Sequence, residues 1–295
     1  MRAALFQKIH ASMRRDPNLF FVTAGVGFGL IEPMRTEFPD RTLDVGIAEQ
    51  NLIGIASGLS NAGFKAVCYS YTNFLAERAF EQIRNDICLH RYAPILVGTT
   101  TGFDNAGLGA THHVLDDIGA LKTLPHLRIY SPSSSESISL IFDEAIAADE
   151  ASFIRCTKSD FSHDRPVAEI NRFVIRDKAP LLVISHGKMI ANALKAHTGA
   201  PCFDLFAMDR IKPLDGNRLK ELFADYRAIV VAEDNFKSGL YNSVAQWMAE
   251  NNIKDTRIHS ISAEEKYRGE IGDPAYLEDL NGLSPQKIAE FIKKI

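Results

Sequence analysis

The fold is decided by residues 38–86, which read FPDRTLDVGIAEQNLIGIASGLSNAGFKAVCYSYTNFLAERAFEQIRND. Apolar residues recur at helical spacing over 48–62, which predicts a helix. The short run that follows, 65–70, is apolar on both faces and predicts a buried strand. Helical spacing then returns in the last part of the stretch. This order of helix, strand and helix predicts an α/β fold.

The same alternation continues on both sides of this stretch. Ser133 with Glu136 three positions on is a capping-box signature that predicts a further helix, and 286–294 predicts a closing one. Strands that alternate with helices predict βαβ units and a mostly parallel sheet covered on both faces. The other runs that predict strands are 19–23, 94–98, 127–131 and 152–157 in the first half, and 181–185, 202–206, 228–232 and 257–261 in the second.

A polar stretch, 159–172, interrupts the alternation and has no clear period. We interpret it as a linker between two domains. The sequence therefore predicts two successive α/β domains, each with a mostly parallel sheet flanked by helices. The first spans residues 1–160 and the second spans 173–295.

Composition limits the classes of function. The 295 residues are 46% hydrophobic and 24% charged, as in an ordinary globular protein, and the net charge of −4 argues against a nucleic-acid binder. No apolar run has transmembrane length and no signal peptide is recognisable, so we expect no membrane association. The four cysteines form no CxxC pair, which predicts buried, reduced thiols in a cytoplasmic protein. They are Cys68, Cys88, Cys156 and Cys202.

The most informative segment for function is 44–51, DVGIAEQN. Glu49 follows the apolar pair Ile47 and Ala48 at the point where a loop passes into a helix. From this local pattern alone, the favoured interpretation is an acidic residue in a first turn that interacts with the helix dipole.

The wider sequence resembles the pyrimidine-binding domain of transketolases and of 1-deoxyxylulose-5-phosphate synthases. The resemblance covers 38–86 and continues through 107–137, GLGATHHVLDDIGALKTLPHLRIYSPSSSES. Weaker similarity to the C-terminal domain of the same family covers 180–194, 204–215 and 229–249. Nearly the whole chain is therefore accounted for by the C-terminal half of a thiamine-diphosphate enzyme.

The resemblance implies roles for three residues. Glu49 matches the glutamate that hydrogen-bonds N1′ of the cofactor's aminopyrimidine and so favours the imino tautomer that activates the thiazolium carbon, with Ile47 beside it among the cofactor-binding residues. Phe74 matches the aromatic residue that stacks on the pyrimidine ring. By spacing alone, a core aromatic is an equally good interpretation of Phe74.

His112 and His113 leave several interpretations open. A metal site is disfavoured, because adjacent histidines point in different directions and no third ligand stands at a usual spacing. A surface or capping pair is the ordinary alternative. The resemblance implies that His112 faces the cofactor and substrate and relays protons to the substrate. The role of His113, which replaces the family's usual glutamine, stays open.

Lys158 falls near the position where relatives place an arginine that binds the distal end of the substrate. A lysine can hold an anionic group but lacks the bidentate fork of arginine. A solvated lysine at the end of a strand is an equally good interpretation. Arg155 is a weaker candidate for the same substrate contact.

The sequence departs from the family pattern near the substrate. Leu108 stands where many transketolases have an acidic residue, and Thr100 stands where they have a histidine. The glycine-rich run 24–29 replaces an acidic element and predicts a tight turn that lets backbone approach a cofactor or partner. These changes imply a less hydroxylated substrate than a sugar phosphate, or one with another group near the reacting carbon.

The family's diphosphate- and magnesium-binding element is absent from the sequence. Mg²⁺ requires oxygen ligands together with the phosphates, so the chain cannot complete a cofactor site alone. The resemblance therefore implies a separate N-terminal partner subunit that holds thiamine diphosphate and Mg²⁺ at the diphosphate end, in an α2β2 assembly.

The leading hypothesis is a transketolase-like subunit that transfers a two-carbon ketol or acyl unit from a ketose or 2-oxo acid to an aldehyde. One rival is a decarboxylating carboligase of the 1-deoxyxylulose-5-phosphate synthase type, and another is a non-catalytic paralogue that binds or regulates another protein. The β subunit of a 2-oxoacid dehydrogenase is disfavoured, because its glutamate motif is spelled differently.

Overall fold

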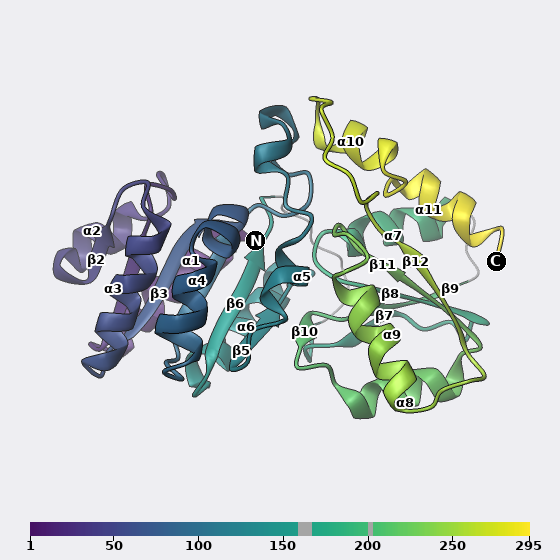
Figure 1. Cartoon of the computed structure of the whole chain (residues 1–295), viewed down its shortest axis with the longest axis horizontal. Coiled ribbons are helices and arrows are strands. Elements are labelled where there is room, and N and C mark those ends of the chain that lie inside the picture. The colour runs from purple at the N-terminus through teal and green to yellow at the C-terminus, as the bar shows by residue number, and fades with distance from the viewer. Residues whose placement is uncertain (159–166, 200–202) are drawn as a thin grey trace.

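The protein, described by a computed structural model for residues 1–158, 167–199 and 203–295, consists of two α/β units side by side (Figure 1). Each unit is built on its own sheet, and the N-terminal half of the chain forms most of the first unit. The predicted fold class is confirmed.

The first sheet has seven strands in the order β10-β5-β6-β4-β3-β1-β2. All neighbours are parallel except β10, which pairs antiparallel with β5. The strands are β1 (Leu19–Thr23), β2 (Thr42–Asp44), β3 (Lys65–Tyr71), β4 (Ile95–Thr99), β5 (Leu127–Tyr130), β6 (Ala151–Cys156) and β10 (Arg210–Lys212).

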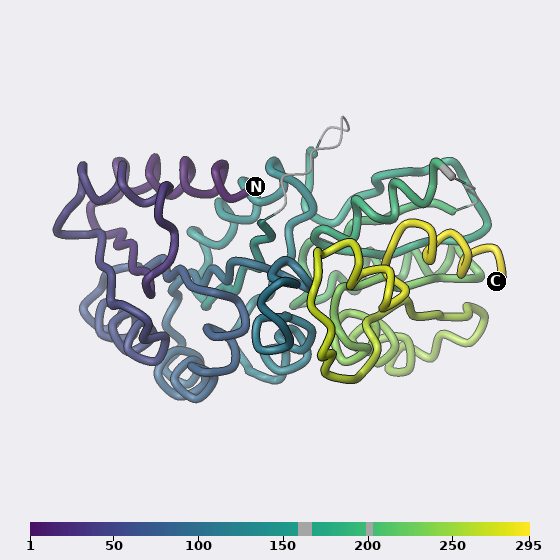
Figure 2. The backbone as a smooth tube through the Cα atoms, turned by 90° about the horizontal axis from the view of Figure 1, so that it is seen from above, coloured from purple at the N-terminus to yellow at the C-terminus, as the bar shows by residue number. Residues whose placement is uncertain are grey.

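Helices cover both faces of this sheet, as Figure 2 shows for α1 on one side and the helices after β2 on the other. Helices α1 (Arg2–Arg15) and α6 (Ser135–Ala147) pack on one face. The other face carries α3 (Glu49–Asn61), the segment from residue 74 to residue 88, and α5 (Asp117–Leu121). That segment consists of two π-helical turns, η2 (Phe74–Arg78) and η3 (Ile83–Cys88), around α4 (Phe80–Gln82); shorter elements are α2 (Glu32–Glu37), η1 (Pro39–Arg41), η4 (Ala106–Leu108) and η5 (Ala110–His112).

The second sheet has five strands in the order β12-β11-β8-β9-β7, parallel except for β7. Successive side chains of a strand point to opposite faces of the sheet. Leu182 and Ile184 of β8 therefore face α8 and α9, while Val183 faces α7 and α11. Its elements are β7 (Arg172–Ile175), β8 (Leu181–Ser185), α7 (Met189–Gly199), β9 (Phe203–Ala207), α8 (Gly216–Asp225), β11 (Ala228–Ala232), α9 (Leu240–Glu250), β12 (Arg257–Ile261), α10 (Pro274–Leu280) and α11 (Pro285–Ile292).

The two units share structure across their boundary. Strand β10 follows β9 of the second unit in the chain, yet it adds to the edge of the first sheet beside β5. One apolar cluster also continues from the first sheet into the second, where it includes Leu182, Phe206 and Val231. The two units therefore pack as one body around a continuous core.

The structure confirms the nine predicted strands within one or two residues and adds three short ones: β2, β7 and β10. The predicted capping box is displaced by one residue, because Ser134 caps α6 and Ser137 completes the box. Of the predicted linker 159–172, residues 159–166 lie outside the described residues, as does Cys202.

Within the described residues, no helix is both long and apolar enough to cross a bilayer. Three of the predicted thiols, Cys68, Cys88 and Cys156, are free and buried. Burial raises the pKa of Cys68 to about 12 and that of Cys88 to about 11, which keeps both thiols protonated at neutral pH.

Candidate functional site

The carboxyl ends of β1, β2, β3 and β4 meet at one edge of the first sheet. The chain runs from β1 outward to β2 and then returns to β3 on the other side of β1, so the strand order reverses between β1 and β3. In open parallel sheets, ligands bind at such a reversal, beyond the carboxyl ends of the strands. The loops after these strands are therefore the expected location of a site.

Two of these loops are held together by one aspartate. Asp44, the last residue of β2, accepts hydrogen bonds at Oδ1 from the backbone N–H groups of Gly25 and Gly46, both at 3.0 Å. Gly25 has φ +67, a left-handed conformation that favours glycine. The tight turn predicted over 24–29 is present, and it lies against the loop that leads into α3.

Glu49 is the first residue of α3 and is only 1% exposed. Its Oε1 accepts a hydrogen bond from the hydroxyl of Ser70 in β3 at 2.9 Å, and its Oε2 forms an ion pair with Arg78 Nη1 at 2.6 Å. The carboxylate is therefore buried and oriented by two donors. The neighbouring Ile47 is 82% exposed, so the loop in front of the carboxylate presents an apolar side chain to the outside.

Three rings gather beside this carboxylate. Phe74 begins the π-helical turn η2 after β3, and its ring meets that of His112 edge to face at a centroid distance of 5.2 Å. Tyr71 meets both rings edge to face, at 5.9 Å from Phe74 and 6.3 Å from His112. The structure thus brings together Phe74 and His112, two of the residues that the sequence assigned to the site.

Arg78 joins the carboxylate to the rings. Its guanidinium carbon lies 4.5 Å from the centroid of the Phe74 ring, while Nη1 contacts Glu49. The sequence analysis missed this residue, because an arginine in a helical segment is ordinarily a solvated side chain. The available signal was its position four residues after Phe74, on the same side of the turn.

The carboxyl end of β4 is strained next to this site. Thr100 is fully buried and has φ +74, a conformation that is rare for a β-branched residue and that recurs at functional sites. Its backbone N–H is held by the carbonyl of Cys156 at 2.9 Å.

The histidine loop is anchored through its backbone. Asn73 donates a hydrogen bond to the carbonyl of Thr111 at 2.6 Å, which ties the loop that carries His112 to the start of η2. His113 is buried, and its ring meets that of Phe103 edge to face at a centroid distance of 5.1 Å. Burial lowers the pKa of His113. Leu108, on the same loop, is 57% exposed.

Lys158 lies at the carboxyl end of β6, on the same edge of the sheet but two strands from β3. Its ammonium group hydrogen-bonds the side chain of Asn105, and its backbone N–H donates to Asp104 Oδ2 at 3.0 Å. Burial lowers the pKa of Lys158. The residue is exposed, and within the described residues it makes no hydrogen bond or ion pair with Glu49, Phe74 or His112.

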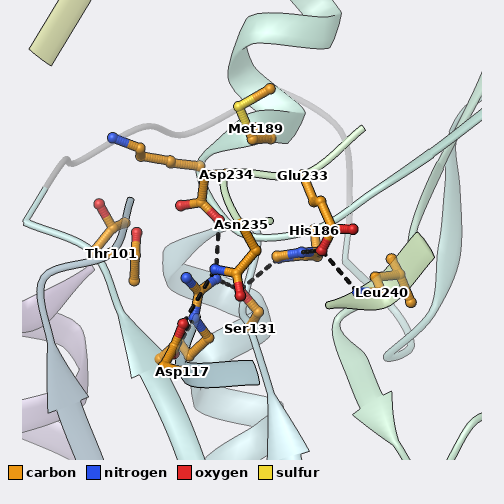
Figure 3. A network of polar contacts seen from close by, with 12 residues as sticks. Thr101, Asp117, Ser131, His186, Met189, Glu233, Asp234, Asn235 and Leu240 are labelled. Carbon is orange, nitrogen blue, oxygen red and sulfur yellow. Dashed lines mark hydrogen bonds and ion pairs between the residues drawn. The ribbon is translucent and has the colours of Figure 1, made fainter. Parts of the chain in front are cut away.

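The structure places Arg155 elsewhere. Its guanidinium is fully buried between the two units, with Nε 2.7 Å from Asp117 Oδ2 and Nη1 3.1 Å from Asp234 Oδ1. Burial opposes its charge, but the two carboxylates outweigh burial and raise the pKa of Arg155. The expectation that Arg155 binds substrate is therefore corrected: its charge is matched by two carboxylates inside the protein. Figure 3 shows Asp117, Ser131 and Asp234 converging in this network.

The residues at the first edge fit one end of the cofactor that the resemblance implies. A buried, oriented carboxylate and a partly exposed aromatic ring suit an aminopyrimidine, which offers a ring nitrogen and a flat face. For the diphosphate end, the described residues contain no group of three or more histidine, cysteine or acidic side chains placed to hold a metal ion.

Comparisons with known proteins identify the family of this chain. The family "Transketolase, pyrimidine binding domain" matches residues 1–163, more than half of the chain. A 1-deoxy-D-xylulose-5-phosphate synthase from Rhodopirellula baltica is 29% identical over 97% of this chain and 46% of its own length. One from Myxococcus xanthus is 31% identical over 82% of this chain and 43% of its own length. The chain thus spans about half the length of these relatives.

Solved structures extend the match to the second unit. A split-gene transketolase, solved as an inactive β4 tetramer, has a TM-score of 0.87 and 25% identity and covers 99% of this chain and 97% of its own. The transketolase of Campylobacter jejuni has a TM-score of 0.81 at 14% identity, which shows the fold alone, over 46% of its length. The chain belongs to the transketolase-type thiamine-diphosphate family, and it carries the family's pyrimidine-binding domain followed by its C-terminal domain.

Proposed function

We propose that this chain is the pyrimidine-binding half of a two-component, thiamine-diphosphate-dependent enzyme that transfers a two-carbon unit to an aldehyde. The observation that carries the proposal is Glu49, a buried carboxylate beside the Phe74 and His112 rings at the point where the strand order reverses. When bound, thiamine diphosphate supplies a nucleophilic carbon for addition to carbonyl groups.

Each residue of the site has a defined part in the proposal. Glu49 holds a proton at N1′ of the aminopyrimidine, and the ring of Phe74 stacks on that heterocycle. His112, whose Nδ1 lies 3.0 Å from the hydroxyl of Thr111, exchanges protons with the substrate oxygen. Lys158 holds an anionic group at the distal end of the substrate.

Two findings support the need for a second subunit. The chain spans about half of its 1-deoxy-D-xylulose-5-phosphate synthase relatives but 97% of the split-gene transketolase chain, which is inactive as a β4 tetramer. The described residues also contain no group of three or more histidine, cysteine or acidic side chains placed to hold a metal ion. We propose that an N-terminal-type subunit supplies the diphosphate and Mg²⁺ site, in an α2β2 assembly.

Calorimetric titration of thiamine diphosphate and Mg²⁺ tests this function. We expect binding to the mixture of this chain with its N-terminal-type subunit and no tight binding to this chain alone. The variant Glu49→Ala should weaken binding in the mixture or abolish turnover. Tight binding to the isolated chain contradicts the incomplete site, and no binding to a well-folded mixture favours a non-catalytic paralogue.

The second candidate is a carboligase that decarboxylates pyruvate to obtain the two-carbon unit. The sequence relatives named 1-deoxy-D-xylulose-5-phosphate synthases favour it, as does Leu108 in place of an acidic residue. Product analysis of the reconstituted mixture separates the candidates: release of CO₂ from pyruvate supports this one, and cleavage of a ketose donor without CO₂ supports the transfer reaction.

A further inference from the structure

One side chain contacts both groups that the proposed function assigns to the aminopyrimidine. The guanidinium of Arg78 donates to Glu49 Oε2 at 2.6 Å and lies over the Phe74 ring with its carbon 4.5 Å from the centroid. Phe74 and Arg78 begin and end the same π-helical turn, η2. Single π-helical turns are rare and recur at functional sites. The geometry of this turn places the cation between the carboxylate and the ring.

The contribution of this contact to folding is small. The side chain of Arg78 is 44% exposed, and ion pairs and cation–π contacts of exposed side chains add little to stability. Its effect on the geometry of the site is larger, because Arg78 connects two separate elements: Glu49 is at the start of α3, and Phe74 follows β3. Without Arg78, Ser70 is the one hydrogen-bond partner that the described residues leave to the carboxylate.

We propose that Arg78 is a positioning residue, which holds the carboxylate of Glu49 and the ring of Phe74 at the mutual distance and angle that an aminopyrimidine requires. This inference rests on the proposed function. Arginine suits the task better than lysine, because its planar guanidinium can donate to a carboxylate and stack on an aromatic ring at the same time. Binding is sensitive to such placement, since a loose site loses affinity to the ordering of its own side chains.

The experiment uses the full chain and one defined probe, the aminopyrimidine half of the cofactor, 4-amino-5-hydroxymethyl-2-methylpyrimidine. Its affinity is measured by NMR titration at about pH 7.5, where glutamate and arginine side chains are ordinarily charged. We expect Arg78→Ala to weaken binding about tenfold, in line with the loss of one charge-assisted contact. Arg78→Lys should recover part of the loss, because lysine restores the ion pair without the stacked plane. A purely structural role would show no such graded rescue.

The matched control is Arg84→Ala. Arg84 is an exposed arginine in the neighbouring turn η3, and its side chain donates a hydrogen bond to Asn85 rather than to the site. The variant Arg84→Ala should leave the affinity for the probe unchanged, and the melting temperatures of all variants should lie within a few degrees of the parent's. Equal affinity of the parent and Arg78→Ala overturns the inference while the proposed function stands. A folded parent chain that binds the probe neither alone nor in the mixture with its N-terminal-type subunit contradicts the pyrimidine site itself, and with it the proposed function.

Discussion

The two sheets of this protein use the same edge in opposite ways. In both, the strand order reverses between parallel neighbours, at β1 and β3 in the first sheet and at β8 and β11 in the second. At the first edge, Glu49, Phe74 and His112 form the candidate site. At the second edge, Arg155 of the first unit bonds Asp117 of its own unit and Asp234, which follows β11. Figure 3 shows Asp117 and Asp234 in this network. The architecture supplies the same kind of edge in each case, and the side chains placed there decide its use. We call the second arrangement the joint: the buried polar contacts of Arg155, Asp117 and Asp234 between the two units.

The joint is a dense network of buried charge. His186, which follows β8, bonds the hydroxyl of Ser131 at 2.9 Å, and Asn235 after β11 donates to Asp117 at 3.1 Å. Further out, Lys188 pairs with Asp104 at 3.2 Å and Glu278 at 2.8 Å. Burial opposes the charge of Lys188, but these carboxylates raise its pKa. Such groups fix the two units relative to each other. The comparison predicts that removing a joint residue costs folding free energy, whereas removing a site residue costs activity.

The largest expected effect is at the joint. Arg155→Ala leaves Asp117 and Asp234 buried without their cation, so we expect the free energy of unfolding to fall by about 3–5 kcal/mol. Chemical denaturation followed by circular dichroism measures the change. The control Arg227→Ala removes an exposed arginine, paired with Asp255 at 3.8 Å, and should change stability by less than about 0.5 kcal/mol. Equal losses in the two variants would contradict a structural role for Arg155.

Glu49→Gln tests the other side of the comparison. The amide is nearly isosteric with the carboxylate and keeps its bond from Ser70, but it shares a proton poorly with a ring nitrogen. We expect activity with the partner subunit to fall about a hundredfold or more, as for loss of an acid–base group. The melting temperature should stay within a few degrees of the parent. A loss of stability as large as that of Arg155→Ala would show that Glu49 is a structural residue.

Gly187→Ala probes how closely the units approach. Gly187 has φ +53, and a Cβ atom there would lie 2.7 Å from Ser131 Oγ, which already bonds Arg155 and His186. We expect a loss of about 2 kcal/mol, part from backbone strain and part from the contact. Gly282→Ala is the matched control: its φ is +75 but nothing lies within 4 Å of the added atom, so strain alone should cost about 1 kcal/mol. Similar losses of stability at both positions would mean that Ser131 and its neighbours can shift to accommodate the added methyl group.

The sequence predicted the sheets well, because buried parallel strands are short apolar runs that need no distant information. It missed β2, β7 and β10, which have three or four residues and owe their strand form to pairing with a longer neighbour. Glu49 was found through a family motif. Arg155 was misassigned because its partners stand 38 and 79 residues away. A lone arginine within the apolar strand ASFIRC was nevertheless a usable signal of a buried ion pair.

The smallest expected effect lies between the two regions, at Glu77. This residue precedes Arg78 in η2, and burial, with the neighbouring Asp116 and Asp117 carboxyls, raises its pKa to about 7. Between about pH 4.5 and 7 the folded protein therefore keeps a proton that the unfolded chain has released, so the free energy of unfolding falls as the pH rises through this window. The glutamine of Glu77→Gln does not ionise, so the free energy of unfolding of this variant does not show that decrease. We expect its melting temperature to exceed the parent's by about 2 °C at pH 8 and to match it near pH 4.

Glu81→Gln, a change to an exposed glutamate in α4, is the control for the loss of one negative charge. A gain in Glu77→Gln that is the same at both pH values would assign the effect to packing rather than to charge. A gain confined to high pH would show that the ionised carboxylate of Glu77 destabilises the fold, as expected from burial and from the neighbouring Asp116 carboxyl. The charge state of η2, the turn that carries Phe74 and Arg78, would then depend on a carboxyl at the start of α5, the helix whose Asp117 pairs with Arg155.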